Sequence, residues 1–226
     1  MWQQELEHFG VATLAGILNV AETESFLACL GRSSLPRSKA GIRHMLNDRA
    51  TAAIAHDPRL MGIARDVLGP TAIPFHATLF DKSPSANWLV VWHQDTALPL
   101  QERTEKPGWG PWSVKQGVLY AHAPAPALET VLALRVHLDD STRENGPLRV
   151  LSGTHNRGVL TDDTIQELAA SVTPADCLVE RGDILVMRPL VVHASSKSRT
   201  NVPRRVLHIE YAASMTIADG LRLASA

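Results

Sequence analysis

The chain has 226 residues, of which 45% are hydrophobic and 20% are charged, and its formal net charge is -1. This composition is typical of a folded globular protein that is large enough for a sizeable core. A net charge this close to zero gives no general attraction to nucleic acid or to an anionic membrane, so we expect neither as a partner.

The N-terminal residues have neither a basic start nor an apolar core, so they do not resemble a signal peptide. No apolar run approaches membrane-spanning length. The two cysteines, Cys29 and Cys177, lie far apart in the sequence and are expected to be free thiols. These features together predict a cytoplasmic protein.

The first 70 residues are predicted to be mainly helical. Apolar residues at helical spacing, with acidic residues in the first turn, predict a helix over residues 21–30. Further amphipathic segments predict helices over residues 48–55 and 58–68, the second of which begins at Asp57-Pro58. The mixed apolar segment 9–18 is compatible with a short strand.

From residue 71 the sequence becomes typical of strands. Short segments rich in Val and Leu, separated by turn residues, predict strands at residues 73–80, 87–95, 118–122, 130–138, 148–151, 190–193 and 205–211. Residues 177–187 are predicted to form a hairpin, and residues 161–170 a surface helix. Residues 96–116 are predicted to be a long loop, whose Trp109 and Trp112 could form a lid or pocket wall or could pack on the rim of a barrel.

This order of elements predicts a mainly β fold with supporting helices. Many short strands with regular turns, preceded by helices, are typical of a jelly-roll, or double-stranded β-helix, core. We expect one domain over residues 1–226, with helical support in residues 1–70 and the jelly-roll core in residues 71–212.

The segment Trp92-His93-Gln94-Asp95 follows an apolar run that is predicted to be a strand. Side chains two positions apart on a strand point the same way, so His93 and Asp95 share one face and Gln94 points to the other. An imidazole and a carboxylate side by side are two of the three ligands of the 2-His-1-carboxylate site that holds non-heme Fe(II). Because such a pair can also be a surface or hydrogen-bonded pair, the metal hypothesis needs a distant second histidine.

His193 is the candidate for that second histidine, because it ends an apolar strand far downstream. In a jelly roll such a strand can return beside the first one and bring three ligands to one end of the barrel. A structural His193 would instead need a buried hydrogen-bond partner. Arg204, at the start of the last strand, could grip a distant carboxylate through paired hydrogen bonds, and Ser195 could add a hydroxyl group.

Taken together, these motifs resemble the phytanoyl-CoA dioxygenase family of Fe(II)- and 2-oxoglutarate-dependent oxygenases. The resemblance covers roughly residues 71 to 212, and the matching segments occur in family order: His93-Gln94-Asp95, Asn145-Gly146-Pro147-Leu148, Leu151-Ser152-Gly153-Thr154-His155, Arg181-Gly182-Asp183, residues 189–195 and Arg204-Arg205. It implies His93, Asp95 and His193 as the iron ligands. It also implies that Arg204, helped by Ser195, binds the far carboxylate of 2-oxoglutarate.

The resemblance further implies contacts to 2-oxoglutarate from Thr78 and Arg135, although the sequence is equally compatible with an outward, solvated Arg135. Arg205 alternates to the face opposite Arg204 and is expected to be structural, and a one-residue register error would exchange the two. Asn145, Gly146 and Gly153 are expected to serve turns, and His155 to orient a loop or reach the pocket. The remaining strand histidines are expected to be core or surface residues rather than ligands: His76, His122, His137 and His208.

The implied activity couples decarboxylation of 2-oxoglutarate to oxidation of a small-molecule substrate by O2, hydroxylating an aliphatic C–H bond and releasing succinate and CO2. A CoA ester is not expected as the substrate, because the chain is shorter than the acyl-CoA hydroxylase that names the family and has no obvious basic cluster for CoA phosphates. Halogenation is not expected, because Asp95 stands where halogenases have a small residue. Two alternatives stay open: a metal-dependent jelly-roll enzyme that does not use 2-oxoglutarate, and a catalytically silent binding module on the same fold.

Overall fold

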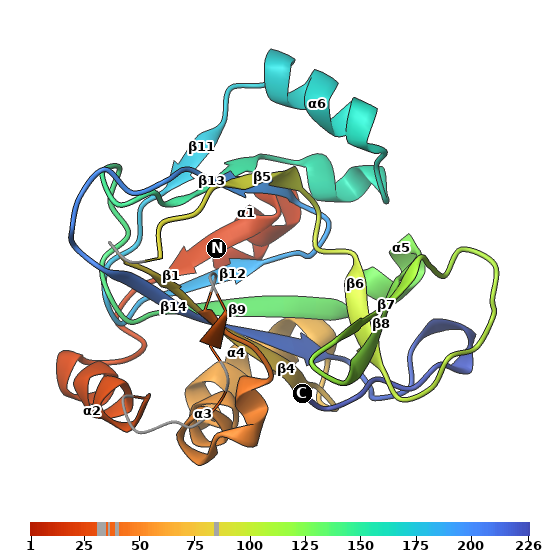
Figure 1. Cartoon of the computed structure of the whole chain (residues 1–226), viewed down its shortest axis with the longest axis horizontal. Coiled ribbons are helices and arrows are strands. Elements are labelled where there is room, and N and C mark those ends of the chain that lie inside the picture. Colours follow the sequence, from red (N-terminus) through yellow and green to blue (C-terminus); the bar gives the residue numbers. More distant parts are fainter. Residues whose placement is uncertain (31–34, 36, 39–40, 84–85) are drawn as a thin grey trace.

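Two antiparallel sheets face each other, and helices cover the outer face of the larger sheet (Figure 1). The computed structural model describes residues 1–30, 35, 37–38, 41–83 and 86–226. Within this part of the chain the larger sheet has the strand order β1 (Val11–Leu14), β12 (Ile184–Met187), β9 (Val131–His137), β14 (Arg204–Ala212), β4 (Ile73–Lys82), β3 (Gly41–Ile42) and β2 (Arg37–Ser38). Mainly β structure in facing antiparallel sheets confirms the predicted jelly-roll class.

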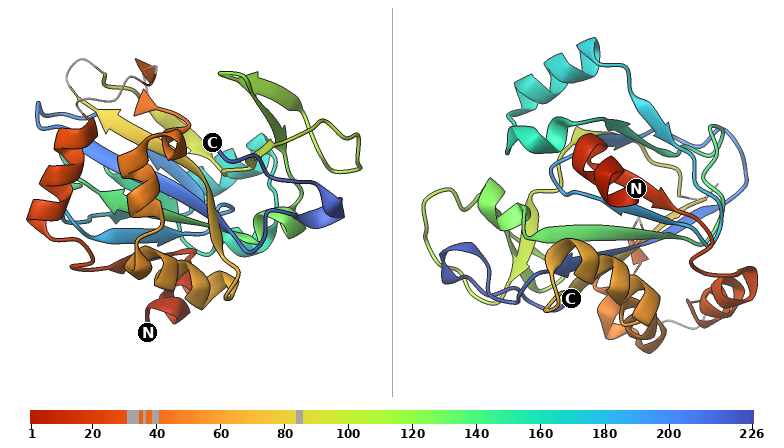
Figure 2. Two further views of the ribbon diagram at one scale, coloured as in Figure 1. Left: turned by 90° about the horizontal axis from the view of Figure 1, so that it is seen from below. Right: turned by 180° about the vertical axis from the view of Figure 1, so that it is seen from behind.

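Two smaller sheets complete the described β structure. The first lies over the larger sheet and has the order β11 (Ala175–Cys177), β10 (Leu148–Leu151), β13 (Val192–Ser195) and β5 (Val90–His93). The second stands at one end of the molecule and has the order β6 (Ala97–Leu100), β8 (Val118–His122) and β7 (Trp112–Lys115) (Figure 2).

The helices lie mainly outside the sheets. Those described are α1 (Trp2–Phe9), α2 (Val20–Leu30), α3 (Arg49–Ala55), α4 (Pro58–Leu68), α5 (Ala125–Leu128) and α6 (Asp162–Ser171), with 3-10 turns η1 (Met45–Asn47), η2 (Thr154–Arg157) and η3 (Ala218–Gly220). Asp57 begins α4 by accepting a hydrogen bond from the Arg59 amide, and Pro58 stands in the first turn, where no N–H partner is needed. The predicted helices at 21–30, 48–55 and 58–68 are therefore confirmed to within a residue. None of the described helices has the length and apolar character to cross a membrane.

Strand β14 shows how alternation divides the molecule into a core and a site. Leu207, Ile209 and Tyr211 point toward the helices and join an apolar cluster with residues of α4 such as Leu60. The residues between them point into the space between the two sheets, where His208 lines a cavity. The helix-side cluster thus fixes the sheet, and the opposite face is free to carry polar side chains.

The prediction of a long loop over residues 96–116 is wrong. Residues 97–100 and 112–115 are β6 and β7, which both pair with β8. Pro99 made this segment resemble a loop, but an edge strand tolerates proline because its missing N–H faces no partner strand. Trp109 is buried in an apolar cluster and donates from Nε1 to Asp219 Oδ2 at 2.9 Å, so it packs rather than covering a pocket.

The prediction of a hairpin over residues 177–187 is also wrong. β11 pairs with β10 in the four-stranded sheet, whereas β12 pairs with β1 and β9 in the larger, seven-stranded sheet. The turn at Gly182 therefore carries the chain from one sheet to the other. A side chain there would meet the Leu18 carbonyl oxygen at 2.1 Å, so the close approach of the two backbones requires glycine.

Candidate metal and cosubstrate site

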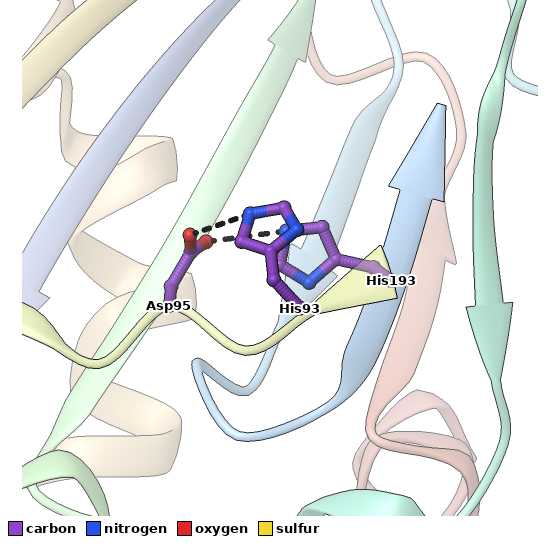
Figure 3. Close-up of side chains that lie close together, drawn as sticks. All are labelled: His93, Asp95 and His193. Carbon is purple, nitrogen blue, oxygen red and sulfur yellow. Dashed lines mark ion pairs between the residues drawn. The ribbon is translucent and has the colours of Figure 1, made fainter. Parts of the chain in front are cut away.

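Two adjacent strands of the four-stranded sheet, β5 and β13, bring the predicted triad together (Figure 3). His93 ends β5 and pairs in register with His193 on β13, so the two imidazole rings lie 4.3 Å apart between centroids. Asp95 follows two residues after His93, and its carboxylate oxygens lie 3.5 Å from His93 Nε2 and 3.5 Å from His193 Nε2. One ligand atom from each residue falls within 4.8 Å of the others.

Hydrogen bonds turn both histidines toward this common point. His93 Nδ1 bonds to the Val91 carbonyl at 2.9 Å, and His193 Nδ1 bonds to the Val191 carbonyl at 2.9 Å. A carbonyl oxygen can only accept, so Nδ1 carries the proton in each ring and Nε2 presents a lone pair. This is the arrangement by which an outer hydrogen bond orients a metal-ligating histidine.

Gln94, which lies between His93 and Asp95 in the sequence, holds this part of the backbone in place. Its amide nitrogen donates to the carbonyls of Leu190 and Gly158, and its oxygen accepts from the Leu160 amide. The side chain therefore points away from the triad, as strand alternation predicted. The backbone amide of Asp95 adds a bond to the Pro189 carbonyl at 3.0 Å.

The electrostatics favour a neutral histidine and an ionised carboxylate at the triad. Burial lowers the pKa of His193 to about 4, so this imidazole stays neutral near pH 7. Burial opposes ionisation of Asp95, but the attraction of the His193 and His93 imidazoles, when they are protonated, outweighs it and lowers the pKa of this carboxyl. Burial opposes protonation of His93, but the hydrogen bond to Asp95 and its charge outweigh burial and raise the pKa of this imidazole. Once a metal ion displaces that proton, two imidazole nitrogens and one carboxylate are a donor set that fits Fe(II) and leaves coordination positions open.

A pair of buried guanidinium groups lies beside the triad. Arg204 and Arg135 line a small cavity with His193 and Ser195, and both arginines are at least 95% buried. Arg204 Nη2 donates to Ser195 Oγ at 3.3 Å, whereas its Nε and Nη1, like Arg135 Nε, have no partner among the described residues. Buried charges are normally paired, so this cavity is suited to an anion.

These features agree with a comparison to known families. A model described as phytanoyl-CoA dioxygenase matches residues 36–206. The chain belongs to the phytanoyl-CoA dioxygenase family. It is therefore a 2-oxoglutarate-dependent oxygenase whose cofactor is Fe(II) and whose cosubstrates are 2-oxoglutarate and O2.

Solved structures with the phytanoyl-CoA dioxygenase fold resemble this chain over most of its length. AviO1 from Streptomyces viridochromogenes Tue57 is 21% identical with a TM-score of 0.67, and the match covers 93% of each chain. EctD from S. alaskensis with 2-oxoglutarate and 5-hydroxyectoine is 20% identical with a TM-score of 0.71, covering 92% of this chain and 74% of that one. HygX from Streptomyces hygroscopicus, with nickel, 2-oxoglutarate and hygromycin B bound, is 18% identical with a TM-score of 0.68, covering 93% and 86%. At these identities the likeness concerns the fold.

The other residues that the family resemblance implied are also placed by the sheets. Thr78 on β4 pairs with His208 on β14 and lines a second cavity that also contains His93 and Asp95. Arg135 points inward and contacts His208 Nδ1 at 3.1 Å, so it is not a solvated surface residue. Arg205 points outward and binds both carboxylate oxygens of Asp139, which fixes the register that separates it from Arg204.

Several other sequence motifs of the family serve the backbone. Asn145 closes its turn by donating to the Asp140 carbonyl and accepting from the Thr142 amide. His155 Nε2 lies 3.1 Å from the Glu7 carbonyl oxygen, so it orients the end of α1 rather than reaching the triad. His137 is buried, as expected for a core residue.

Sequence reasoning missed Lys82. This fully buried side chain donates from Nζ to Ser195 Oγ at 2.8 Å and to the Ser196 carbonyl at 2.5 Å, and it stacks over the Trp88 ring. Burial, followed by repulsion from Arg204, lowers the pKa of Lys82 to about 7. No local sequence signal marks this residue, because only the register of β4 and β14 shows that Lys82 stands directly opposite Arg204.

Proposed function

We propose that His93, Asp95 and His193 hold Fe(II), and that Arg204 and Ser195 hold the distal carboxylate of 2-oxoglutarate. We further propose that the enzyme hydroxylates an aliphatic C–H bond of a small molecule. One oxygen atom of O2 would enter the product hydroxyl group and the other would enter succinate, with release of CO2. Bound Fe(II) supplies the activation of O2 that this reaction needs.

The residues of the chain contribute position and charge. The Nδ1 bonds of His93 and His193 keep both Nε2 atoms aimed at one point, so little reorganisation is needed when metal binds. Arg204 offers a planar fork of donors to a carboxylate, and Ser195 lies next to it. Fixing the cosubstrate at its far end orients its keto-acid end toward the triad. Thr78 and Arg135 are proposed as further contacts to 2-oxoglutarate.

The observation that carries this proposal is the pair of guanidinium groups, Arg204 and Arg135, which are buried next to the triad and have no carboxylate partner among the described residues. A metal enzyme that did not use a dicarboxylate would gain nothing from two buried cations at this place, and burying them is costly. The small molecules in the EctD and HygX structures, 5-hydroxyectoine and hygromycin B, support a small-molecule substrate here. We also propose that residues 1–226 form one catalytic domain, because both the helix-side cluster and the site depend on β14.

An anaerobic titration with Fe(II) and 2-oxoglutarate tests this proposal. Binding of both should produce the visible charge-transfer band of a keto-acid chelate. His193→Ala should abolish the band, and Arg204→Met should shift its half-saturation to higher 2-oxoglutarate concentration. Arg205→Met is the matched control, because Arg205 binds Asp139 on the other face and should leave the titration unchanged.

The same titration separates the alternatives. Iron binding without a band on addition of 2-oxoglutarate would favour a metal enzyme that does not use this cosubstrate. Folded protein with no affinity for iron would favour a silent binding module. Either result would refute the proposed function.

A further inference from the structure

A second cavity borders His93 and Asp95 of the triad and is not lined by Arg204. It has a volume of about 340 Å³ and shares His93, Asp95 and Phe80 with the cavity that contains Arg204. A molecule in it would therefore lie next to the proposed metal position while 2-oxoglutarate occupies the other cavity. We call it the polar cavity, because Phe80 and Ala97 are the only purely apolar side chains among its described lining residues.

A hydrogen-bonded chain of four side chains supports one wall of the polar cavity: Glu210, His76 and Tyr120 line the cavity, and His44 bonds to Tyr120 without lining it. Glu210 Oε2 lies 2.5 Å from His76 Nδ1, and His76 Nε2 lies 3.1 Å from the Tyr120 hydroxyl. The same hydroxyl lies 3.0 Å from His44 Nε2. These residues come from β14, β4, β8 and the segment before η1, so several parts of the fold are needed to build the chain.

The donors in this chain run in one direction. Burial, followed by the negative charge of Glu210, raises the pKa of Tyr120, so its hydroxyl keeps a proton. If His76 donates to Glu210, its other nitrogen accepts from Tyr120, whose oxygen then accepts from His44. Glu210 Oε1 is left with no protein partner in the part of the chain that the structure describes. An acceptor next to the cavity is thereby kept for an incoming donor.

The backbone at His44 shows that this wall is built at a cost. The backbone of His44 has φ 58° and ψ 40°, a left-handed conformation that residues other than glycine rarely adopt. The residue is nonetheless buried, with its ring directed at Tyr120. Strained residues of this kind persist where the surrounding structure requires them, and they cluster at functional sites.

Other residues that line the polar cavity add more donors and acceptors. The Thr96 hydroxyl lies 2.6 Å from His122 Nδ1, and Lys115 Nζ lies 4.7 Å from the centre of the Tyr120 ring. Arg43 also lines the cavity, so cationic groups face the anionic Glu210. Charges of both signs give no preference for a strongly charged ligand. An alkyl chain in this space would strip water from these groups without replacing their hydrogen bonds.

We propose that the polar cavity binds a neutral, hydroxyl-rich substrate of the sugar or cyclitol class, with Glu210 and Tyr120 as binding residues that orient one of its C–H bonds toward the triad. This inference rests on the proposed function and narrows its substrate class. A site built to bond hydroxyl groups rejects an analogue that lacks them, because its own buried polar groups would be left unpaired. Acyl chains and acyl-CoA esters are therefore excluded as substrates.

Calorimetry on the full chain loaded with Fe(II) and 2-oxoglutarate without oxygen tests this inference. The hydroxyl-rich probes are myo-inositol, methyl α-D-glucopyranoside and maltose, and the apolar probes are octanoate and octanoyl-CoA. We expect a hydroxyl-rich probe to bind and the apolar probes not to bind. Glu210→Gln and Tyr120→Phe should each weaken that binding about tenfold, because each removes a hydrogen bond that involves or supports a charged group.

Tyr211→Phe is the matched control. Tyr211 lies on the same strand as Glu210 but faces the helices and donates to the Ala55 carbonyl, so probe binding should not change. Binding of octanoate in preference to the hydroxyl-rich probes, no binding of any hydroxyl-rich probe, or unchanged binding in both cavity variants would overturn the inference. The chelate band, recorded on the same samples, keeps the two proposals apart. Its absence refutes the proposed function, whereas a normal band with any of these binding results refutes the substrate class alone.

Discussion

Replacing Arg204 by methionine should make the apoprotein more stable and its cosubstrate binding weaker. The guanidinium is 3% exposed and has no carboxylate partner among the described residues. Burial, followed by repulsion from Arg135, lowers its pKa from 12.5 to about 9. At 1.36 kcal/mol per pKa unit this corresponds to about 5 kcal/mol of unfavourable free energy for the charged form. Methionine keeps an unbranched apolar stem without that charge.

The hydrogen bond to Ser195 offsets part of this cost, since a bond from a charged donor contributes about 2 kcal/mol. We therefore expect Arg204→Met to raise the free energy of unfolding of the apoprotein by about 1–3 kcal/mol. The same substitution should weaken 2-oxoglutarate binding at least about a hundredfold, because a buried cation–carboxylate contact is worth about 3 kcal/mol or more.

Urea unfolding with and without 2-oxoglutarate and Fe(II) measures both effects. Wild-type protein should gain stability from the cosubstrate, and Arg204→Met should not, although it starts from a higher value. Arg205→Met breaks an ion pair that is partly exposed, so it should lower stability by at most about 1 kcal/mol and keep the gain from the cosubstrate. An Arg204→Met apoprotein less stable than wild type would refute the reasoning, since the fold itself would then satisfy the charge.

Three further predictions concern neighbouring residues. Burial, then repulsion from nearby arginines, holds the pKa of His137 well below its usual range, so below about pH 6.5 the unfolded chain binds more protons than the folded protein. The free energy of unfolding should therefore decrease as the pH is lowered from 7 to 5. Urea unfolding at these two pH values should show a smaller decrease in His137→Leu. Gly146→Ala would place a Cβ 2.3 Å from a backbone carbonyl oxygen, so it should cost about 2 kcal/mol or more in thermal unfolding, whereas Gly117→Ala, at a similar φ but with open space, should cost less; equal costs would contradict the steric argument. Lys82→Met removes the donor that holds Ser195, so the chelate titration should show about tenfold weaker 2-oxoglutarate binding, and an unchanged titration would make the lysine purely structural.

Local alternation was enough to predict that His93 and Asp95 lie together, whereas the place of His193 beside them was implied by the family resemblance. His93 and Asp95 share a face because a strand repeats every two residues, and His193 joins them because β13 returns beside β5, as a jelly roll allows. Helix boundaries were equally accessible, since caps such as Asp57 act within a few residues. The assignment of the triad to iron, and of Arg204 to 2-oxoglutarate, stays a prediction that the titration tests.

Features that depend on pairing between distant strands were not accessible in the same way. Lys82 lies beyond the strand that was predicted at residues 73–80, and only the register with β14 reveals that it stands opposite Arg204. The hydrogen-bonded chain through Tyr120 joins residues far apart in the sequence: His76 and Glu210, which bond to each other, are 134 positions apart. No local sequence pattern indicates such a contact. The predicted hairpin at 177–187 failed for the same reason, since two neighbouring strands that belong to different sheets have the same local sequence pattern as a hairpin.

The position of β14 constrains how this enzyme can change its substrate. Nearly every residue of that strand is buried, with one face in the core and the other toward the candidate site, so a substitution there disturbs either the packing or the site. Strand β7, at the edge of the β6–β8–β7 sheet, is more exposed, and its Lys115 reaches the polar cavity from one end of the molecule (Figure 2). New specificities should therefore be sought by diversifying this strand, while the sheets that carry β14 and the triad are kept as a fixed frame for the chemistry.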